Sequence, residues 1–339
     1  MTLPEASRTQ LTSDLRICRI LNGMWQVSGA HGLIDPETAV ENMFDYLDSG
    51  FTTWDLADHY GPAEDFVGQF RRELSASRGL EALSGVQAFT KWVPQPGKMT
   101  RGLVEESVAM SLRRMDVEAV DLLQFHWWDY ADNNYLDALT HLSELQLQGT
   151  IRHLGLTNFD TEHLKRIVDH GIEVVSNQVQ FSLIDRRPEV QMVGFCQESG
   201  LQLLTYGTLC GGLLSDRYLG QPQPRGGALD TASLAKYVRM VEAWGDWGLF
   251  QQLLVTLKGI GDKNSVSIAN VAVRYILDRP TVAGVIVGAR LGLTDHREDN
   301  ARVFHFALDE EDLDHIEAVL RHSHNLFDLI GDCGDEYRR

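Results

Sequence analysis

The sequence is short of cysteine and of basic side chains. Only four of its 339 residues are cysteines, and no two of them form a C-x-x-C pair. This spacing is typical of reduced thiols and predicts neither a disulfide framework nor a zinc site. Thirty Lys and Arg residues stand against 48 Asp and Glu residues, a formal net charge of −18. Because phosphates are bound mostly by basic side chains, this charge argues against nucleic acid and anionic membranes as main partners.

Other absences limit the class of protein further. No apolar run approaches the ~18 residues of a membrane span, and the first residues lack the apolar segment of a secretory signal. No G-x-G-x-x-G, P-loop or HExxH motif is present. The stretch 220–228 is rich in Gly and Pro but lies within a longer loop, so we interpret it as part of an insertion. We therefore expect a cytoplasmic protein whose single domain spans 1–339, with a loop insertion at 208–250 and a tail at 322–339.

Short apolar segments alternate with amphipathic ones along most of the chain. The pattern predicts strands at 20–25, 52–57, 88–92, 120–126, 151–157, 174–179, 201–206 and 282–287. It predicts helices between them at 36–49, 63–74, 101–115, 135–148, 161–169, 187–199 and 265–277. Eight strands in such alternation indicate a parallel sheet closed into a (β/α)8 barrel. We also expect a small hairpin at 11–18 on the barrel floor, a helix within 234–247, and helices at 296–304 and 310–321.

Nearly every predicted strand delivers a polar or aromatic side chain at its carboxyl end, where such barrels place their chemistry. In chain order these residues are Trp25, Asp55 with Tyr60, Lys91, His126, Thr157 with Asn158, Gln178, Tyr206 and Arg290. A strand-end Asp is usually a cap or a turn former, and a lone His or Lys is often structural. The complete set on one rim is better explained by a shared site.

Four of these residues suit one chemical task. A tyrosine that acts as a general acid needs a pKa brought down from ~10, and a lysine beside it would favour the phenolate. We therefore expect Lys91 to activate Tyr60, Asp55 to hold Lys91 in place, and His126 to hydrogen-bond an incoming carbonyl oxygen. A different interpretation makes Lys91 the Schiff-base lysine of a barrel aldolase or lyase.

These motifs resemble the aldo-keto reductase superfamily over about residues 15–320. The resemblance rests on Asp55 with Tyr60 and Gly61, on Thr90-Lys91, on the run from Leu122 to Trp127, and on similar runs around Asn158, Gln178 and Arg290. It implies that Asp55, Tyr60, Lys91 and His126 are the family's catalytic tetrad. It further implies reversible hydride transfer between NAD(P)H and a carbonyl, without a metal.

The resemblance also implies cofactor contacts. Thr157, Asn158 and Gln178 correspond to the groups that bind the carboxamide of the nicotinamide, and Tyr206 to the ring stacked on it. Met24 and Trp25 lie along the ribose, and the loop with Gly207, Thr208, Leu209 and Gly211 wraps the pyrophosphate. The adenosine end falls on Gly288, Arg290, His296, Asp299 and Asn300. Because His296 replaces an arginine common in the family, we expect NADPH (NADP+) to be preferred and NADH to be accepted.

The substrate side is less determined by the sequence. Trp25, Trp92, Trp127 and Trp128 cluster near strand ends and predict an aromatic pocket for a small carbonyl compound. The leading hypothesis is an NADPH-dependent reductase of aldehydes or ketones. The alternative from another class is a cofactor-binding, redox-sensing auxiliary subunit with little turnover. The sequence leaves the oligomeric state open.

Overall fold

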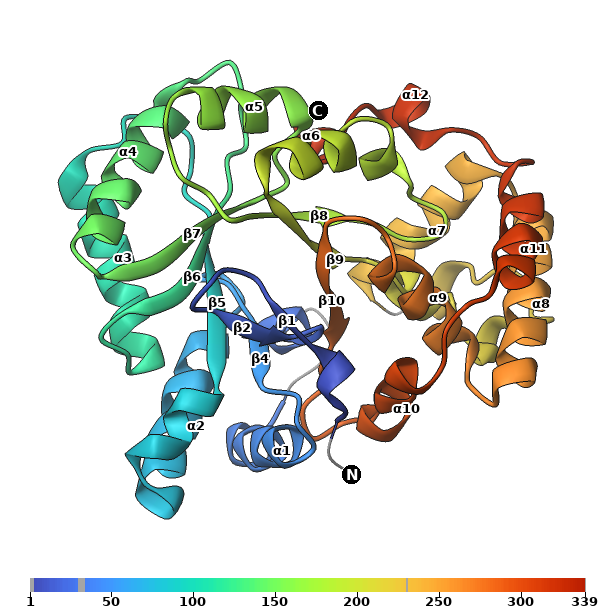
Figure 1. The fold of residues 1–339 in the computed structure, drawn as a ribbon, viewed down its shortest axis with the longest axis horizontal. Helices are drawn as coiled ribbons and strands as arrows, with labels where there is room; N and C mark the ends of the chain where they lie inside the picture. The colour runs from blue at the N-terminus through green and yellow to red at the C-terminus, as the bar shows by residue number, and fades with distance from the viewer. Residues whose placement is uncertain (1–2, 30–33, 230, 339) are drawn as a thin grey trace.

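The structure is a computed structural model that describes residues 3–29, 34–229 and 231–338. Its centre is a closed barrel of eight parallel strands (Figure 1). The strands are β3 (Ile20–Gly23), β4 (Thr53–Asp55), β5 (Gln87–Trp92), β6 (Val120–Phe125), β7 (Ile151–Thr157), β8 (Ser176–Gln180), β9 (Gln202–Tyr206) and β10 (Val282–Gly288). The barrel closes where β10 pairs with β3, with Val285 opposite Ile20. The predicted (β/α)8 architecture is confirmed.

An amino-terminal hairpin covers one end of the barrel. Its strands are β1 (Arg8–Gln10) and β2 (Arg16–Cys18), which pair antiparallel. Leu11 and Leu15 from this hairpin pack with Leu21, Phe89 and Leu122 of the barrel strands in a small buried cluster. The expected floor hairpin is therefore present, although its first strand begins before residue 11.

Helices surround the barrel and were mostly predicted to within a few residues. They are α1 (Pro36–Asp48), α2 (Ala63–Arg78), α3 (Arg101–Met115), α4 (Asn134–Leu147), α5 (Thr161–Asp169), α6 (Met192–Ser199), α7 (Ala232–Trp244), α8 (Trp247–Asn264), α9 (Ile268–Leu277), α10 (Arg297–Arg302), α11 (Glu310–Leu320) and α12 (Leu326–Ile330). Their starts follow ordinary capping chemistry: the side chains of Asp35, Thr100 and Asp160 each accept a backbone N–H of the first turn.

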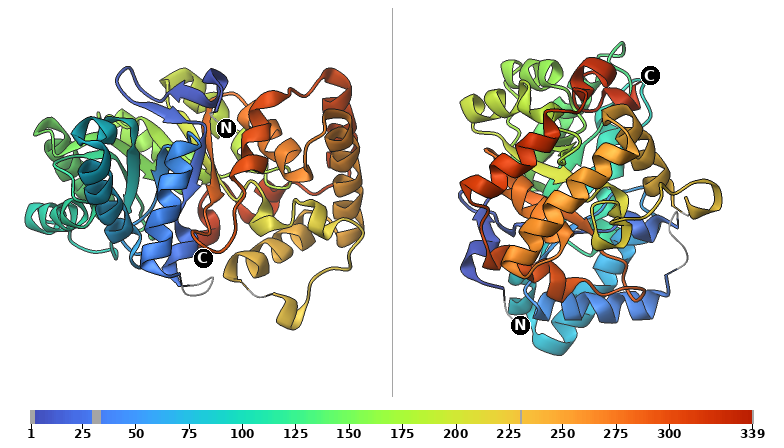
Figure 2. Two further views of the ribbon diagram at one scale, coloured as in Figure 1. Left: turned by 90° about the horizontal axis from the view of Figure 1, so that it is seen from below. Right: turned by 90° about the vertical axis from the view of Figure 1, so that its right-hand side faces the viewer.

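The segment expected to be a long loop contains two helices. The sequence predicted one helix at 234–247, whereas α7 ends at Trp244 and an 18-residue helix, α8, follows directly. Gly245 separates them in an extended conformation, and Asp246 caps the second helix by accepting from the backbone of Leu249. Figure 2 shows this pair, coloured yellow to orange, lying to one side of the barrel.

A large aromatic and aliphatic core lies between the barrel and its helices. Trp54 is fully buried and packs against Tyr46 of α1 and Phe70 of α2, at ring-centroid distances of 5.6 and 6.3 Å. Because side chains alternate along a strand, an outward Trp54 sends its neighbour Asp55 to the inside of the barrel. All four cysteines are buried and unpaired, as the sequence predicted.

The tail expected after 321 folds back onto the barrel. A buried guanidinium, Arg187, donates to both carboxylate oxygens of Asp185 at 2.8 Å and to those of Glu336 at 2.8 and 3.1 Å. It also donates to the backbone carbonyl of Asp332 at 3.0 Å. These bonds fix residues 332–336 over the strand ends of the barrel, beside the site described next.

Candidate active site

Asp55 and Lys91 form a buried ion pair inside the barrel. The Lys91 Nζ donates to Asp55 Oδ2 at 2.7 Å and to the carbonyl of Leu56 at 2.9 Å, and both side chains are about 4% exposed. Burial lowers the pKa of Lys91, whereas the adjacent Asp55 opposes this shift. The pair therefore keeps a cation at the strand ends where water cannot screen it.

Two amides complete the surroundings of Asp55. Gln124 Nε2 and Gln178 Nε2 donate to Asp55 Oδ1 at 2.9 and 2.7 Å. The nitrogen of Gln178 also contacts the Gln124 oxygen at 2.7 Å. Since the Gln178 nitrogen is used in this way, its oxygen is the atom that can accept from a ligand amide. Gln124 was not assigned a role from the sequence, although its register opposite Lys91 places it at the same level of the barrel.

Tyr60 lies in the loop after β4, next to this pair. The Lys91 Nζ is 5.0 Å from the centroid of the Tyr60 ring, and Trp25 meets the same ring edge to face at 5.0 Å. We expected Lys91 to lower the pKa of Tyr60. Burial, followed by the charge of Asp55, instead raises that pKa well above 10. The phenol of the chain alone is therefore a neutral proton donor.

His126 stands at the end of β6, the neighbour of the strand that carries Lys91. Its Nδ1 lies 3.0 Å from the carbonyl oxygen of Thr157, so this nitrogen carries the hydrogen. Burial lowers the His126 pKa to about 4, so the ring is neutral at pH 7. Its Nε2 is buried without a hydrogen-bond partner among the described residues. In this state Nε2 accepts rather than donates, which differs from the donor role expected from the sequence.

Asn158 and Tyr206 form a second polar group across the barrel. Asn158 has a left-handed backbone, with φ of 59°, which asparagine tolerates better than most residues. The Tyr206 hydroxyl donates to Asn158 Oδ1 at 2.8 Å and lies 3.0 Å from the hydroxyl of Tyr337 in the tail. The Thr157 hydroxyl donates to the carbonyl of Gln178 at 3.3 Å, so it braces the neighbouring strand.

The loop after β9 brings its backbone close to α7. A Cβ at Gly207 would lie 2.1 Å from the Tyr237 hydroxyl, and φ there is 70°. Gly211 is similarly crowded by Tyr237 and has φ of 64°, while the buried Thr208 hydroxyl donates to the carbonyl of Phe181 at 2.9 Å. The positive φ and the close approach of Tyr237 therefore favour glycine at Gly207. Leu209 is partly buried within it.

The residues expected around adenosine follow β10 and begin α10. Arg290, Asp299 and Asn300 are partly exposed, and His296 is exposed. The carboxylate of Asp299 accepts from the Ser267 hydroxyl at 2.8 Å. Arg297, which the sequence did not single out, is the guanidinium next to His296, but it pairs with Asp295 at 2.7 Å and with Asp45 at 3.4 Å. Gly288 packs against the Gln26 side chain, and Met24 is fully buried, so its side chain belongs to the core.

Two of the four expected pocket tryptophans contact Tyr60 or His126. Trp25 meets Tyr60, and Trp128 meets His126 edge to face at 4.4 Å. Trp127 is instead fully buried and donates its indole N–H to the carbonyls of Asp129 and Asp132. Trp92 is 6% exposed and packs on Phe125. Trp127 and Trp128 therefore face different surroundings, and of the two it is Trp128 that contacts His126.

Several residues of the site come from parts of the chain that the sequence reading left without a role. Tyr337 bonds Tyr206, and its ring lies perpendicular to His126 at a centroid distance of 6.3 Å. Lys236 of α7 donates to the Tyr337 hydroxyl at 2.6 Å. Arg338 donates to the carbonyl of Trp127 and lies over the Tyr130 ring at 3.9 Å. An aromatic residue in an acidic tail was the only sequence signal for Tyr337.

The described residues contain neither a cluster of metal-binding side chains nor a helix suited to a membrane. Across residues 3–29, 34–229 and 231–338, no three His, Cys, Asp or Glu side chains are grouped so that they could hold a metal ion. In the same part of the chain, no helix has the length and apolar character needed to cross a membrane.

Comparison with known proteins places this geometry in a family. The family model described as "Aldo/keto reductase family" matches residues 19–321. Flagellar radial spoke protein 5 of Chlamydomonas reinhardtii is 33% identical over 180 residues, which cover 48% of this chain and 34% of that protein. Chloroplastic pyridoxal reductase of Arabidopsis thaliana is 26% identical and covers 70% of this chain. The chain spans only about a third of the first relative and 65% of the second.

Other relatives are matched over a larger share of their own length. The NADH-specific methylglyoxal reductase of Escherichia coli (strain K12) is 24% identical over 69% of this chain and 78% of its own length. An aldo/keto reductase from Klebsiella pneumoniae, solved with NADP and acetate, has a TM-score of 0.69 at 20% identity, covering 93% of this chain and 95% of that one. The structural match shows a shared fold. With the family model matching nearly the whole barrel, the chain belongs to the aldo/keto reductase family.

Proposed function

We propose that this protein is an NADPH-dependent oxidoreductase that reduces aldehyde or ketone carbonyls to alcohols, with Tyr60 as the general acid. The observation that carries the proposal is the buried Lys91–Asp55 pair at 2.7 Å with the Tyr60 ring 5.0 Å from the ammonium. Family membership and the complete set of four residues support it. The Klebsiella pneumoniae relative was solved with NADP, and the Escherichia coli relative is named as NADH-specific, so both dinucleotides occur among relatives.

The residues present fit a nicotinamide dinucleotide. The glycine-lined bend at Gly207 and Gly211 suits a pyrophosphate, and the amide nitrogen of Asn158 with the amide oxygen of Gln178 suits a carboxamide. Tyr206 offers an aromatic ring beside them. When bound, the reduced nicotinamide supplies the hydride for the carbonyl carbon. Arg290 is the residue that we assign to a 2′-phosphate, which would favour NADPH.

Residues of the chain itself then donate the proton and stabilise the charge that remains. Asp55, held by Gln124 and Gln178, keeps Lys91 charged and stationary beside Tyr60. The neutral Tyr60 phenol gives its proton to the carbonyl oxygen as negative charge develops there, and the Lys91 charge stabilises the phenolate that remains. His126, with its hydrogen on Nδ1, presents Nε2 as an acceptor for the hydroxyl of the alcohol product. Trp25 and Trp128 contact the rings of Tyr60 and His126 at this position.

A direct assay tests the proposal. The protein is first titrated with NADPH and with NADH by fluorescence to establish that a dinucleotide binds. A panel of reactive aldehydes, including nitrobenzaldehydes, is then added, and loss of reduced-nicotinamide absorbance is followed. Turnover that requires both protein and aldehyde is expected. Bound dinucleotide without turnover across the panel would contradict the proposal.

A further inference from the structure

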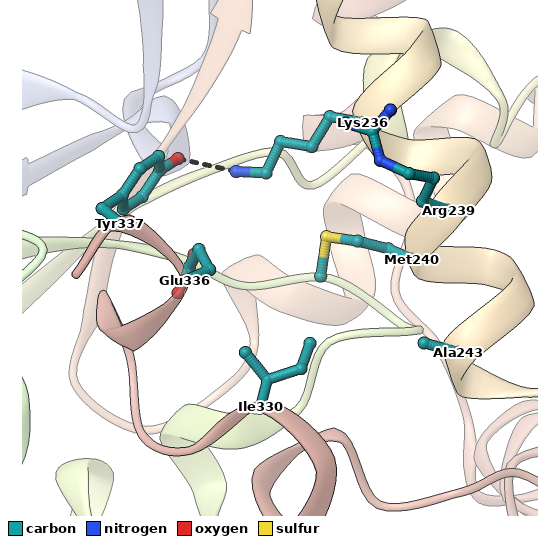
Figure 3. A pocket seen from close by; sticks show the side chains of 7 residues that line it. All are labelled: Lys236, Arg239, Met240, Ala243, Ile330, Glu336 and Tyr337. Atoms are coloured by element: carbon teal, nitrogen blue, oxygen red, sulfur yellow. Dashed lines mark hydrogen bonds between the residues drawn. The ribbon is translucent and has the colours of Figure 1, made fainter. Parts of the chain in front are cut away.

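A cavity of about 400 Å³ lies between α7 and the tail, next to the reaction centre. Its walls are Lys236, Arg239 and Met240 from α7, and Ile330, Glu336 and Tyr337 from the tail. Figure 3 shows Lys236 reaching across from α7 to the Tyr337 hydroxyl, with Met240 and Ile330 lower in the cavity. The cavity thus combines two cations with an apolar interior.

Both cations are available to a ligand. Within the described part of the chain, neither Lys236 nor Arg239 forms an ion pair, and the Lys236 Nζ donates only to the Tyr337 hydroxyl. The one carboxylate in the wall, that of Glu336, is bound at both oxygens by Arg187. Asp185, Arg187 and Glu336 together carry one negative charge in excess, which the two cations outweigh. Although the protein has a net charge of −18, the charges that line this cavity favour an anion.

A short chain of hydroxyl groups joins the cavity to the reaction centre. Lys236 donates to Tyr337 at 2.6 Å, and the Tyr337 hydroxyl lies 3.0 Å from that of Tyr206. The Tyr337 ring also meets the ring of His126. Tyr337 is therefore a wall shared by the cavity and the reaction centre, and inside the cavity Lys236, Arg239 and the Tyr337 hydroxyl can all donate to an anionic group.

We propose that this cavity binds the anionic group, carboxylate or phosphate, of a carbonyl substrate, with Lys236 as the main specificity-determining residue. This inference rests on the proposed carbonyl reduction and adds the substrate class. Met240 and Ile330 contact the carbon chain that links the two ends of the substrate. Arg239, which is exposed, adds charge at the outer end of the cavity.

Matched substrates test the proposal. One pair is 4-carboxybenzaldehyde and its methyl ester, and the other is glyceraldehyde 3-phosphate and glyceraldehyde, so that carboxylate and phosphate are tested separately. The wild-type protein should prefer the anionic member of at least one pair in kcat/KM. Lys236→Met should reduce that preference about tenfold to hundredfold, mainly through KM, because it removes a hydrogen bond to a charged group. Lys236→Arg, which keeps the charge, should retain it.

Control variants and other readouts separate the outcomes. Lys165→Met removes a charge from the exposed ion pair with Asp169 on α5 and should leave the preference unchanged. An unchanged preference in Lys236→Met overturns the anion subsite while leaving carbonyl reduction intact. So does a tenfold loss of NADPH affinity at constant preference, which would assign Lys236 to the dinucleotide phosphates. Failure to reduce either member of both pairs with dinucleotide bound would instead reject the proposed function itself.

Discussion

At the scale of single residues, the proposal that Tyr60 donates the proton can be tested directly. Tyr60→Phe removes the phenolic proton but keeps the ring that Trp25 and Lys91 contact. Turnover should therefore fall about 10²- to 10⁴-fold, the range for loss of a general acid, with little change in NADPH affinity. Steady-state kinetics and a fluorescence titration measure the two effects. Equal losses of binding and turnover would show that Tyr60 serves the dinucleotide and not the proton transfer.

His126 makes a prediction about stability and pH. Its pKa is about 4 in the folded chain against 6.5 for the unmodified side chain, so the unfolded state binds more protons between these values. The free energy of unfolding should therefore increase as the pH rises from 4 to 6.5. His126 should account for about 3 kcal/mol of that increase. Urea denaturation of the wild type and of His126→Asn at pH 4.5 and 7 measures it. An identical pH dependence in both proteins would contradict the assignment.

At the scale of elements, the tail depends on one buried guanidinium. Arg187→Met leaves the carboxylates of Asp185 and Glu336 without their partner, and breaking a buried pair on one side costs about 3–5 kcal/mol. We expect that loss in urea denaturation, together with faster hydrogen exchange in residues 332–338. Arg302→Met is the matched control, because its exposed pair with Glu298 should contribute less than about 1 kcal/mol. An Arg187 variant as stable as this control would show that the tail is held by other contacts.

Helix α7 of the insertion contacts two parts of the candidate site. The sequence predicted a helix at 234–247 but gave it no role, whereas α7 carries both Tyr237, which packs on Gly207, and Lys236, which reaches Tyr337. The same helix therefore shapes the proposed pyrophosphate loop and the anion cavity. Because Lys236 and Tyr237 are adjacent in α7, a small shift of this helix would displace both the loop at Gly207 and the wall of the cavity.

At the scale of the whole molecule, charge is the dominant property. With a net charge of −18, the folded chain repels itself, and salt screens that repulsion within a Debye length of about 10 Å at 0.1 M. Most ion pairs here are exposed and individually weak. Screening of these attractive pairs should therefore lower Tm less than screening of the net repulsion raises it. Raising NaCl from 0.01 to 0.15 M at pH 7.5 should therefore raise Tm. Near the calculated isoelectric point of about 5.0 the increase should disappear. A Tm that falls with salt at pH 7.5 would show that the ion pairs dominate.

Local patterns in the sequence determined the barrel and the rim of the site. Strand and helix periods are properties of neighbouring residues, and the end of a parallel strand is also a place in the barrel. For this reason Asp55, Lys91 and His126 could be assigned to one site without coordinates. The same alternation explains why Trp54, the neighbour of Asp55, lies outside the barrel and packs on Tyr46 and Phe70. The sequence did not show which of Trp127 and Trp128 contacts the site, because the alternation of side chains is not maintained beyond the end of a strand.

Contacts between distant parts of the chain decided the rest. The meeting of Tyr337 with Tyr206 and Lys236 joins segments 131 and 101 residues apart, and no local pattern encodes that meeting. The pKa of Tyr60 was misjudged for the same reason. Sequence order shows which charges are near, but only the packed structure sets how far burial and the charge of Asp55 outweigh the effect of Lys91 on that pKa. Side-chain types followed from local sequence, while burial and the closing of the tail followed from tertiary packing.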